Sequence, residues 1–345
     1  MLRPQVNITF VSSTDTTLKF NFCNSFETDE SYEHLTDTAR IVVPRKLNFE
    51  GQDLFAGASP LFKRGDKVTI EAGYYPNLNT IFEGYISKIN AKIPVEVECE
   101  DSMFLLKQYT VTYPDKYSTI YLGTNGKFLK RPKTISANIT LKELMDNIIE
   151  DAIDYKILDN IKLGQFRVIN ATPAMVLEKL KDEYGLFSYF VEGVLNVGFA
   201  NNAADTKEAL FEMEKVIINS QDLDYQIEDN IKVKVKAISM NSDNTKTEVE
   251  VGDSDGEQKT IHKYNMDEDE LKEVAEKWIK EFKYTGFKGE IETFGEPYVR
   301  HGDRAKITST KLPERDGTYL IKGVKRKMSV GGGFRQILDL GIKVG

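Results

Sequence analysis

The stretch Arg64-Gly65-Asp66-Lys67-Val68-Thr69-Ile70 recurs near the other end of the chain as His301-Gly302-Asp303-Arg304-Ala305-Lys306-Ile307. In both copies a Gly-Asp pair precedes a strand-like run. This combination is typical of a tight turn, in which Gly takes a positive φ and the Asp side chain bonds the backbone two residues on. We therefore expect structural turns at both Gly-Asp pairs, with both glycines at positive φ.

A second strand-like run follows each turn at nearly equal distance and holds an interior glycine. These glycines are Gly84 in the first copy and Gly323 in the second. Glycine inside a strand suggests a bulge or a bend. The repeated spacing indicates two similar β units, one near each end of the chain, and residues 64–89 and 301–326 are expected to superpose as equivalent hairpins.

The length of the chain also favours several packed units. It has 345 residues and 40% hydrophobic content, whereas one hydrophobic core stops growing at roughly 250–300 residues. The first hundred residues contain short alternating or β-branched runs that predict strands. These runs are 7–10, 17–22, 40–43, 67–72, 81–89 and 95–100. Residues 103–107 lose the alternation, which predicts a short helical turn closing this unit.

The middle of the chain has a different pattern. A capping box formed by Thr140 and Glu143 begins an amphipathic helix over 141–152. A second helix is expected from the N-cap Thr172 to a stop at Gly185. Strands are expected at 166–169 and over 187–197, the latter turning at Glu192-Gly193. Residues 108–205 thus predict a smaller α+β insert.

β patterning returns after residue 216, with strands expected at 231–239 and 245–251. A helix over 267–284 interrupts it, with one apolar and one charged face. The expected fold is mainly β, with an α+β insert between two related β units. We expect three segments: 1–107, 108–205, and 206–345 with the single helix.

Composition disfavours several classes of function. The net charge is −8 and the basic residues are dispersed, so no cluster resembles a phosphate-binding surface, and sequence-specific nucleic-acid binding is not expected. Neither a signal-peptide stretch nor an apolar run of about 18 residues occurs, so no membrane span is expected and the protein should be made in the cytoplasm. Cys23 and Cys99 are too far apart for a local metal site and are expected to be reduced core thiols.

No sequence pattern predicts catalysis, a cofactor or a metal. His34, His262 and His301 do not lie at metal-ligand spacing. Nucleophile-elbow, P-loop and dinucleotide-binding motifs do not occur. The run 331–333 is all glycine and precedes a strand-like segment, which predicts a hairpin turn. Residues 253–257 contain acidic side chains but lack the regular spacing of a calcium loop, and a solvated turn is expected.

Two other readings stay open. A hydrolase could in principle use Asp222, Asp224, Glu228 and Asp229 as an acid/base pair, but an acidic loop between strands is the commoner outcome. A carbohydrate-binding module could use an aromatic platform formed by Tyr74, Tyr75 or Tyr85.

Three sets of segments together resemble a known family. They are 64–68 with 81–86 and 99–103, then 175–186 with 194–197, and finally 301–303 with 317–321 and 331–341. In this order they resemble the baseplate hub proteins of contractile phages, including the late control protein D family, which are similar to the hub part of type VI secretion spike proteins. Residues 109–139 match no segment of that family.

The resemblance implies two related β-barrel domains per chain with an α+β portion between them, assembled as a homotrimer. It also implies a structural, non-catalytic hub that adapts the sixfold tail tube to the threefold spike. The alternative on the same scaffold is a tail-associated peptidoglycan hydrolase or endopeptidase, which would need a Cys/His, Glu/His or metal centre, and the sequence shows none. The expected partners are the tube protein, the spike protein and other baseplate proteins. The expected location is the tail baseplate of a virion or phage-like particle assembled in the bacterial cytoplasm, with any hydrolase or needle on a separate polypeptide.

Overall fold

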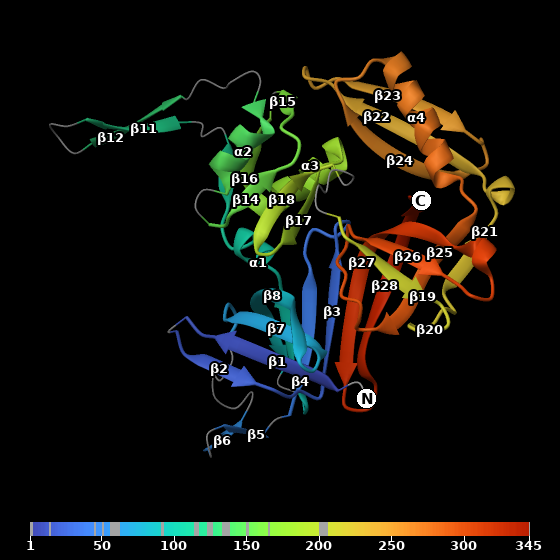
Figure 1. The fold of residues 1–345 in the computed structure, drawn as a ribbon. Coiled ribbons are helices and arrows are strands. Elements are labelled where there is room, and N and C mark those ends of the chain that lie inside the picture. Colours follow the sequence, from blue (N-terminus) through green and yellow to red (C-terminus); the bar gives the residue numbers. More distant parts are fainter. Residues whose placement is uncertain are drawn as a thin grey trace. The chain divides into compact units, whose positions relative to one another are not determined.

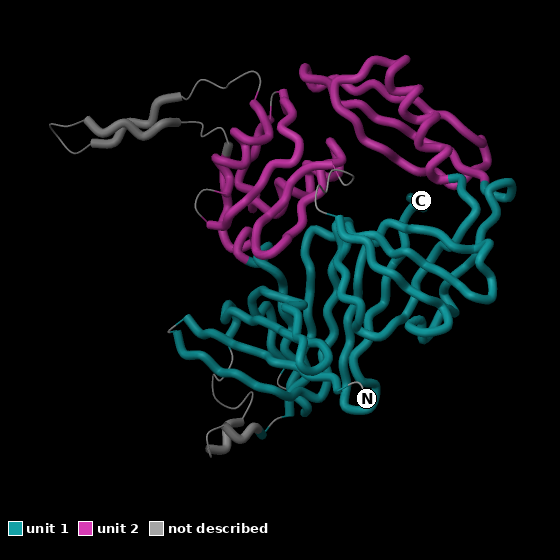
Figure 2. Tube along the Cα trace, in the orientation of Figure 1, with its two compact units in different colours: residues 1–104, 203–231, 283–345 teal, residues 105–202, 232–282 magenta. Residues whose placement is uncertain are grey.

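The computed structural model describes most of the chain. The described residues are 3–13, 15–44, 46–49, 52–55, 63–90, 93–113, 117–122, 127–132, 139–149, 152–164, 166–199 and 206–344. Two compact units are present (Figure 2). Unit 1 consists of residues 1–104, 203–231 and 283–345, and unit 2 of residues 105–202 and 232–282.

This grouping differs from the three consecutive segments expected from the sequence. Residues 232–282, which we had assigned to the second β unit, belong with the middle of the chain. The boundaries at 107/108 and 205/206 stay a prediction.

Unit 1 is built on one 14-stranded sheet (Figure 1). Its strands are β1 (Pro4–Val11), β2 (Thr17–Phe20), β3 (Ser25–Ser31), β4 (Thr38–Val43), β7 (Lys67–Tyr74), β8 (Asn77–Asn90), β9 (Val95–Glu100), β19 (Glu208–Glu212), β20 (Ile217–Asn219), β21 (Leu223–Gln226), β25 (Gly286–Phe294), β26 (Arg304–Thr308), β27 (Gly317–Ser329) and β28 (Gly333–Lys343). Unit 1 also holds the hairpin β5 (Lys46–Phe49) and β6 (Gln52–Phe55) and the 3₁₀ turns η2 (Glu228–Asn230) and η3 (Pro313–Arg315), and the first boundary between the units falls within the helix α1 (Met103–Leu106).

The order of strands in the sheet is β2-β1-β7-β8-β9-β4-β3-β27-β28-β25-β20. β21 also pairs with β25, while β26 pairs with β27 and β19. The β segments from the two ends of the chain are therefore the two halves of one sheet. They join where β3 pairs with β27 over seven residues, from Gly323 opposite Ser31 to Ser329 opposite Ser25.

Alternating side chains give each half its own hydrophobic core. In β7 the side chains of Val68, Ile70 and Ala72 are buried, as the alternation in the sequence predicted. They belong to the cluster of the first half, and Phe211, Ile291 and other residues form the cluster of the second half. The strands expected in the first hundred residues are present, as is the short helix α1.

Unit 2 contains α2 (Leu141–Ile148), α3 (Pro173–Tyr184) and α4 (Glu268–Phe282). Its strands are β10 (Val111–Tyr113), β11 (Tyr117–Leu122), β12 (Lys127–Pro132), β13 (Ile139–Thr140), β14 (Tyr155–Ile157), β15 (Lys162–Gly164), β16 (Val168–Ala171), β17 (Phe187–Val191), β18 (Val194–Gly198), β22 (Val233–Met240), β23 (Lys246–Gly252) and β24 (Glu257–Tyr264).

The helix ends in unit 2 follow the expected capping chemistry. Thr140 and Glu143 form the predicted capping box of α2. The Thr172 side chain caps α3, and Gly185 ends it in the left-handed conformation with φ 67°. The turn between β17 and β18 lies at Glu192 and Gly193, both at positive φ, as the sequence predicted.

A three-stranded sheet of unit 2 has β22 at its centre, antiparallel to β23 and parallel to β24. Helix α4 packs on β22 and β23, with Leu271 and Ala275 buried. Residues 109–139, which matched no family segment, include the hairpin of β11 and β12, which pair only with each other. Within this stretch, 114–116, 123–126 and 133–138 lie outside the described residues. Among the described helices, none is long and apolar enough to cross a membrane.

Candidate interaction surface on the duplicated sheet

The two Gly-Asp turns have the same backbone geometry. Gly65 has φ 91° and Gly302 has φ 85°, both positive as expected. The Gly65 amide donates to Ile86 O at 2.8 Å, and the Ile86 amide donates to Asp66 O at 2.9 Å. In the second copy the Gly302 amide donates to Ile321 O at 2.8 Å, and the Ile321 amide donates to Asp303 O at 2.9 Å.

The buried aspartate side chains also act alike. Asp66 Oδ2 accepts from the Lys63 amide at 2.8 Å, and Asp303 Oδ2 accepts from the Arg300 amide at 2.9 Å. We had expected each aspartate to bond the backbone two residues on. The carboxylate bonds the amide three residues before it instead, because the turn folds back over the preceding residues. The repeated hydrogen bonds make the two turns equivalent.

Gly84 and Gly323, in contrast, are not equivalent. Because Ile86 and Ile321 bond the two turns alike, Gly84 lies two residues before the shared position and Gly323 two residues after it. A Cβ on Gly84 would lie 2.1 Å from Glu100 O, so this glycine permits close approach of β9. Gly323 lies beside a register shift in the pairing of β27 with β28, the bulge that an interior glycine suggests.

The joint between the halves carries a row of buried polar side chains. Thr28 of β3 lies opposite Arg326 of β27, which lies opposite Gln336 of β28, which lies opposite Thr293 of β25. All four are at most 1% exposed. This row separates the two hydrophobic clusters along the strands. Gln336 Nε2 donates to Pro297 O at 2.8 Å and the Thr293 hydroxyl donates to Phe294 O at 2.8 Å, whereas Thr28 Oγ1 has no hydrogen-bond partner among the described residues.

Arg326 has three kinds of partner within the joint. Its Nη2 donates to Val299 O, and its Nη1 lies 3.0 Å from Glu30 Oε1 in an ion pair. The guanidinium also stacks 4.8 Å from the centre of the Tyr298 ring. Tyr298 in turn donates to Thr80 O at 3.1 Å. The charge is therefore compensated by one carboxylate and one aromatic face.

A carboxyl pair lies next to the joint. The Asp37 Oδ1 atom accepts from the Ser31 amide at 3.0 Å, and the Asp37 amide donates to Asp101 Oδ2 at 3.0 Å. Desolvation and, secondly, the neighbouring Asp101 hold the pKa of Asp37 well above its usual range.

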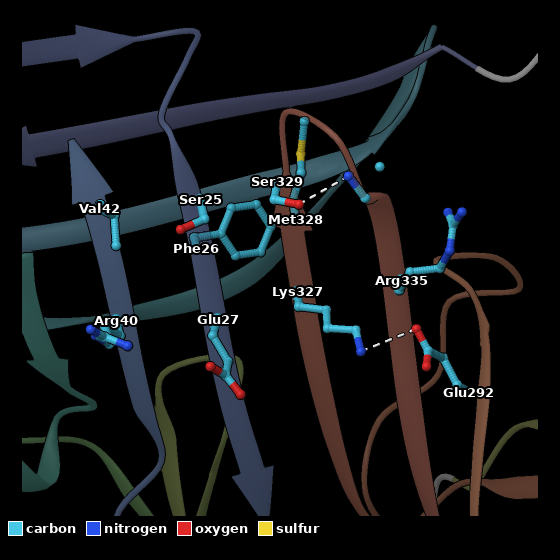
Figure 3. A pocket seen from close by; sticks show the side chains of 12 residues that line it. Ser25, Phe26, Glu27, Arg40, Val42, Glu292, Lys327, Met328, Ser329 and Arg335 are labelled. Atoms are coloured by element: carbon cyan, nitrogen blue, oxygen red, sulfur yellow. Dashed lines mark hydrogen bonds and ion pairs between the residues drawn. The ribbon is translucent and has the colours of Figure 1, made fainter. Parts of the chain in front are cut away.

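The face of the sheet opposite the cores is charged. Its cations pair with carboxylates on the same sheet. Lys322 and Arg40 pair with carboxylates on the adjacent strand, Asp339 at 2.9 Å and Glu96 at 2.5 Å, and Lys325 and Lys327 of β27 pair across β28 with Glu290 at 3.5 Å and Glu292 at 3.1 Å of β25. Figure 3 shows Lys327 extending past β28 toward Glu292.

A cavity of about 360 Å³ lies on this face over the joint, lined by Glu27, Arg40 and Arg335 among others. This surface is open and mixed in charge, which suits contact with a large partner better than enclosure of a small ligand.

The histidines and cysteines do not come together. No group of three metal-ligating side chains gathers anywhere in the described ranges. His301 stacks edge-on with Tyr32, and burial lowers the pKa of both His301 and His262. Cys23 and Cys99 are free thiols, and burial raises the pKa of Cys23 to about 11.

The acidic residues 222–229 lie along β21 and the turn η2, and all four carboxylates are exposed. The tyrosines do not form a shared platform: Tyr74 is buried and donates to Phe334 O at 2.8 Å, and Tyr85 stacks on Phe104 at 5.7 Å. The triglycine run forms the turn between β27 and β28, and residues 253–256 form a turn between β23 and β24, as expected for both.

No family model matches the chain. One curated protein, the telomerase reverse transcriptase of Euplotes aediculatus, is 26% identical over 149 residues, which is 39% of this chain. The chain spans only 14% of that protein's length. Such a partial match carries no argument about function.

Solved structures match nearly the whole chain. The tail protein from Neisseria meningitidis MC58 has a TM-score of 0.59 at 12% identity, covering 99% of this chain and 96% of that chain. The prophage MuSo2 43 kDa tail protein from Shewanella oneidensis has a TM-score of 0.58 at 13% identity, covering 98% of both chains. An E. coli component of the type VI secretion system, described as similar to T4 bacteriophage tail proteins, has a TM-score of 0.57 at 10% identity, covering 94% of this chain and 74% of that chain. The chain therefore has the mainly β fold shared by phage tail proteins and this type VI secretion component, the fold expected of a baseplate hub.

Proposed function

We propose that this protein is the structural baseplate hub of a contractile phage tail or a phage-like injection machine, adapting a sixfold tail tube to a threefold spike. The observation that carries the proposal is the duplication inside a tail-protein fold. Two turns with matching hydrogen bonds lie in the two halves of one sheet. Three copies of such a chain would present six similar units to a sixfold ring.

The proposed assembly is a homotrimer. A threefold ring uses heterologous contacts, so each chain needs two different complementary patches. The two halves of unit 1 supply such a pair, because they are similar in backbone and different in side chains. The proposed partners are the tube protein, the spike protein and other baseplate proteins, in a tail baseplate assembled in the bacterial cytoplasm.

The charged face of the sheet suits the lining of such a ring. The cations Lys322, Lys325 and Lys327 are paired with carboxylates, while Glu27 and Asp29 add further negative charge on β3. Paired lysines attract phosphate groups less than a basic channel would. DNA or another cargo could therefore pass this face without being held.

We also propose that the protein is not an enzyme. The described side chains gather no metal-ligand group, and the acidic residues 222–229 follow a strand edge and a turn. Peptidoglycan hydrolysis by the purified chain would contradict this part of the proposal.

Mixing experiments test the proposed partners. The purified chain would be combined with tube and spike proteins from the same source, and the masses of the complexes would be measured by native mass spectrometry. The proposal predicts complexes that contain three copies of this chain and three copies of the spike protein. Absence of any complex with either protein would contradict the hub function.

A further inference from the structure

Three polar atoms of the row at the joint are buried and make no hydrogen bond to any described residue. They are Thr28 Oγ1 of β3, Arg326 Nε of β27 and Gln336 Oε1 of β28. Their residues are at most 1% exposed. A buried polar group without a hydrogen bond lowers the stability of a fold, and native proteins satisfy nearly all such groups. The three atoms therefore point to a bound partner.

The three side chains are neighbours in the sheet. Arg326 lies directly opposite Thr28 on one side and directly opposite Gln336 on the other, and Figure 1 shows β3, β27 and β28 side by side. Directly opposed side chains lie on one face of the sheet, with Cβ atoms about 4.5–5.5 Å apart. Thr28 and Gln336 are two strand spacings apart, about 9.6 Å, which favours a bridging group over a direct hydrogen bond.

The segment 297–299 covers this row and fixes the orientation of the Gln336 amide. Gln336 Nε2 donates to Pro297 O at 2.8 Å, and Arg326 Nη2 donates to Val299 O. A backbone carbonyl only accepts hydrogen bonds, so the nitrogen of the amide group must face Pro297. Gln336 Oε1 is therefore held on the other side of the amide group, as an acceptor that needs a donor.

The charge at the site is already compensated. Arg326 Nη1 and Glu30 Oε1 form an ion pair at 3.0 Å. What remains is one N–H donor, one carbonyl acceptor and one hydroxyl that can both donate and accept. A halide ion cannot donate to Gln336 Oε1, and a metal cation cannot accept from Arg326 Nε. Water does both, and buried waters typically make about three hydrogen bonds to groups that are otherwise unpaired.

We propose that the joint binds a structural water molecule, which accepts from Arg326 Nε, donates to Gln336 Oε1 and bonds to the Thr28 hydroxyl. This water links β3 of the first half to β27 and β28 of the second. All of its partners lie within one chain, so the inference does not depend on the proposed trimer.

The bound water also favours one register of the joint. A shift of β3 by one residue along β27 turns Thr28 to the other face of the sheet. A shift by two residues places Phe26 or Glu30 opposite Arg326 instead of Thr28, and neither side chain supplies a hydroxyl. The water loses one of its three partners in each of these registers.

A high-resolution crystal structure of the full-length chain tests the site directly. The inference predicts one ordered solvent peak within about 3.2 Å of Thr28 Oγ1, Arg326 Nε and Gln336 Oε1. Direct hydrogen bonds among these side chains, or the absence of a solvent peak between them in a well-ordered joint, would overturn it.

Thr28→Val tests the site in solution, because valine keeps the shape of threonine and removes the hydroxyl. Loss of a hydrogen bond to the water should lower the folding equilibrium constant about fivefold. A hydroxyl without a partner predicts the opposite sign, since its removal relieves the cost of burying a polar group. The matched control is Thr38→Val, at an exposed position of the adjacent strand β4, which measures the effect of valine on strand propensity alone. Stability of Thr28→Val equal to or above that of the control would contradict the inference.

A double-mutant cycle tests whether Thr28 and Gln336 share the water. In a Gln336→Met background, Thr28→Val should lower the folding equilibrium constant at least about twofold less than it does alone. The comparison pair is Thr28→Val with Thr293→Val, because the Thr293 hydroxyl already donates to Phe294 O at 2.8 Å, and these two effects should be independent. Independent effects in both pairs, or equal coupling in both, would overturn the shared water.

Discussion

Gly65 and Gly302 have positive φ, and a Cβ at either position would meet only open space. Their substitution therefore tests backbone strain without a steric clash. We expect Gly65→Val and Gly302→Val each to lower the free energy of unfolding by about 1–2 kcal/mol, because a β-branched residue is strongly penalised at positive φ. Urea denaturation measures the change.

Gly331→Val is the matched control. Gly331 also has open space for a Cβ, and its φ lies outside the positive region, so its substitution should change the stability little. If the control loses as much stability as the two turn variants, or if the turn variants lose none, the Gly-Asp turns are ordinary loop sequence.

The ion pair of Arg326 and Glu30 should matter more than the exposed pairs of the sheet. Arg326 is fully buried, so removing its partner leaves an uncompensated charge. We expect Glu30→Ala to cost about 3 kcal/mol, and much less in an Arg326→Met background. Glu290→Ala, which breaks an exposed pair with Lys325, should cost less than about 1 kcal/mol. Equal losses from the two alanine variants would contradict the role of the joint.

The environment of Asp37 predicts that the stability of the fold depends on pH. Its pKa is raised in the folded chain, so its contribution to stability is fully present below the pKa of the unfolded chain and is lost as the pH rises through the folded value. The free energy of unfolding of Asp37→Asn, relative to that of the unsubstituted chain, should therefore be more favourable at neutral pH than at pH about 4. Thermal unfolding at both pH values measures this. Asp229→Asn, an exposed control, should leave the pH dependence unchanged, and a similarly unchanged profile for Asp37→Asn would contradict the prediction.

At the scale of elements, Gly185 links helix α3 to strand β24. It has φ 67°, and a Cβ there would lie 2.2 Å from His262 Cβ. Gly193 has φ 80° and open space around it. Gly193→Ala should cost about 1 kcal/mol from backbone strain alone, and Gly185→Ala should cost more because His262 must also move. Equal losses in denaturation experiments would show that α3 and β24 are not tightly packed.

Sequence patterns predicted elements whose signals are local. The caps of α3, Thr172 and Gly185, act within a few residues, and the alternation of β7 reflects one buried face. Strand β3 was missed because its inward positions include the polar residue Thr28, which breaks the apolar alternation and is buried only because β3 lies at the joint. The sequence comparison treated Gly84 and Gly323 as equivalent positions, and they are not. The equivalent positions follow from a bulge at Ser87 in the first half and at Lys322 in the second, and a bulge has no fixed sequence signal.

At the scale of the molecule, duplication was visible because both copies kept the Gly-Asp turn. The sequence did not reveal that residues 232–282 group with the middle of the chain, because the packing of distant segments depends on contacts that no local pattern carries. The joining of both β units in one sheet was hidden for the same reason: β3 and β27 are almost 300 residues apart, as in the hydrogen bond from Ser31 Oγ to Lys322 O.

The central claim is that a chain with two similar β halves assembles as a threefold ring. Sedimentation velocity of the purified chain over a wide range of concentrations, alone and with the spike protein, tests it most directly. The account predicts a species with three times the chain mass of 39.2 kDa, persisting on dilution because permanent assemblies commonly bury about 2,000 Å² or more per interface. A monomer at every concentration, unchanged by the spike protein, would contradict it.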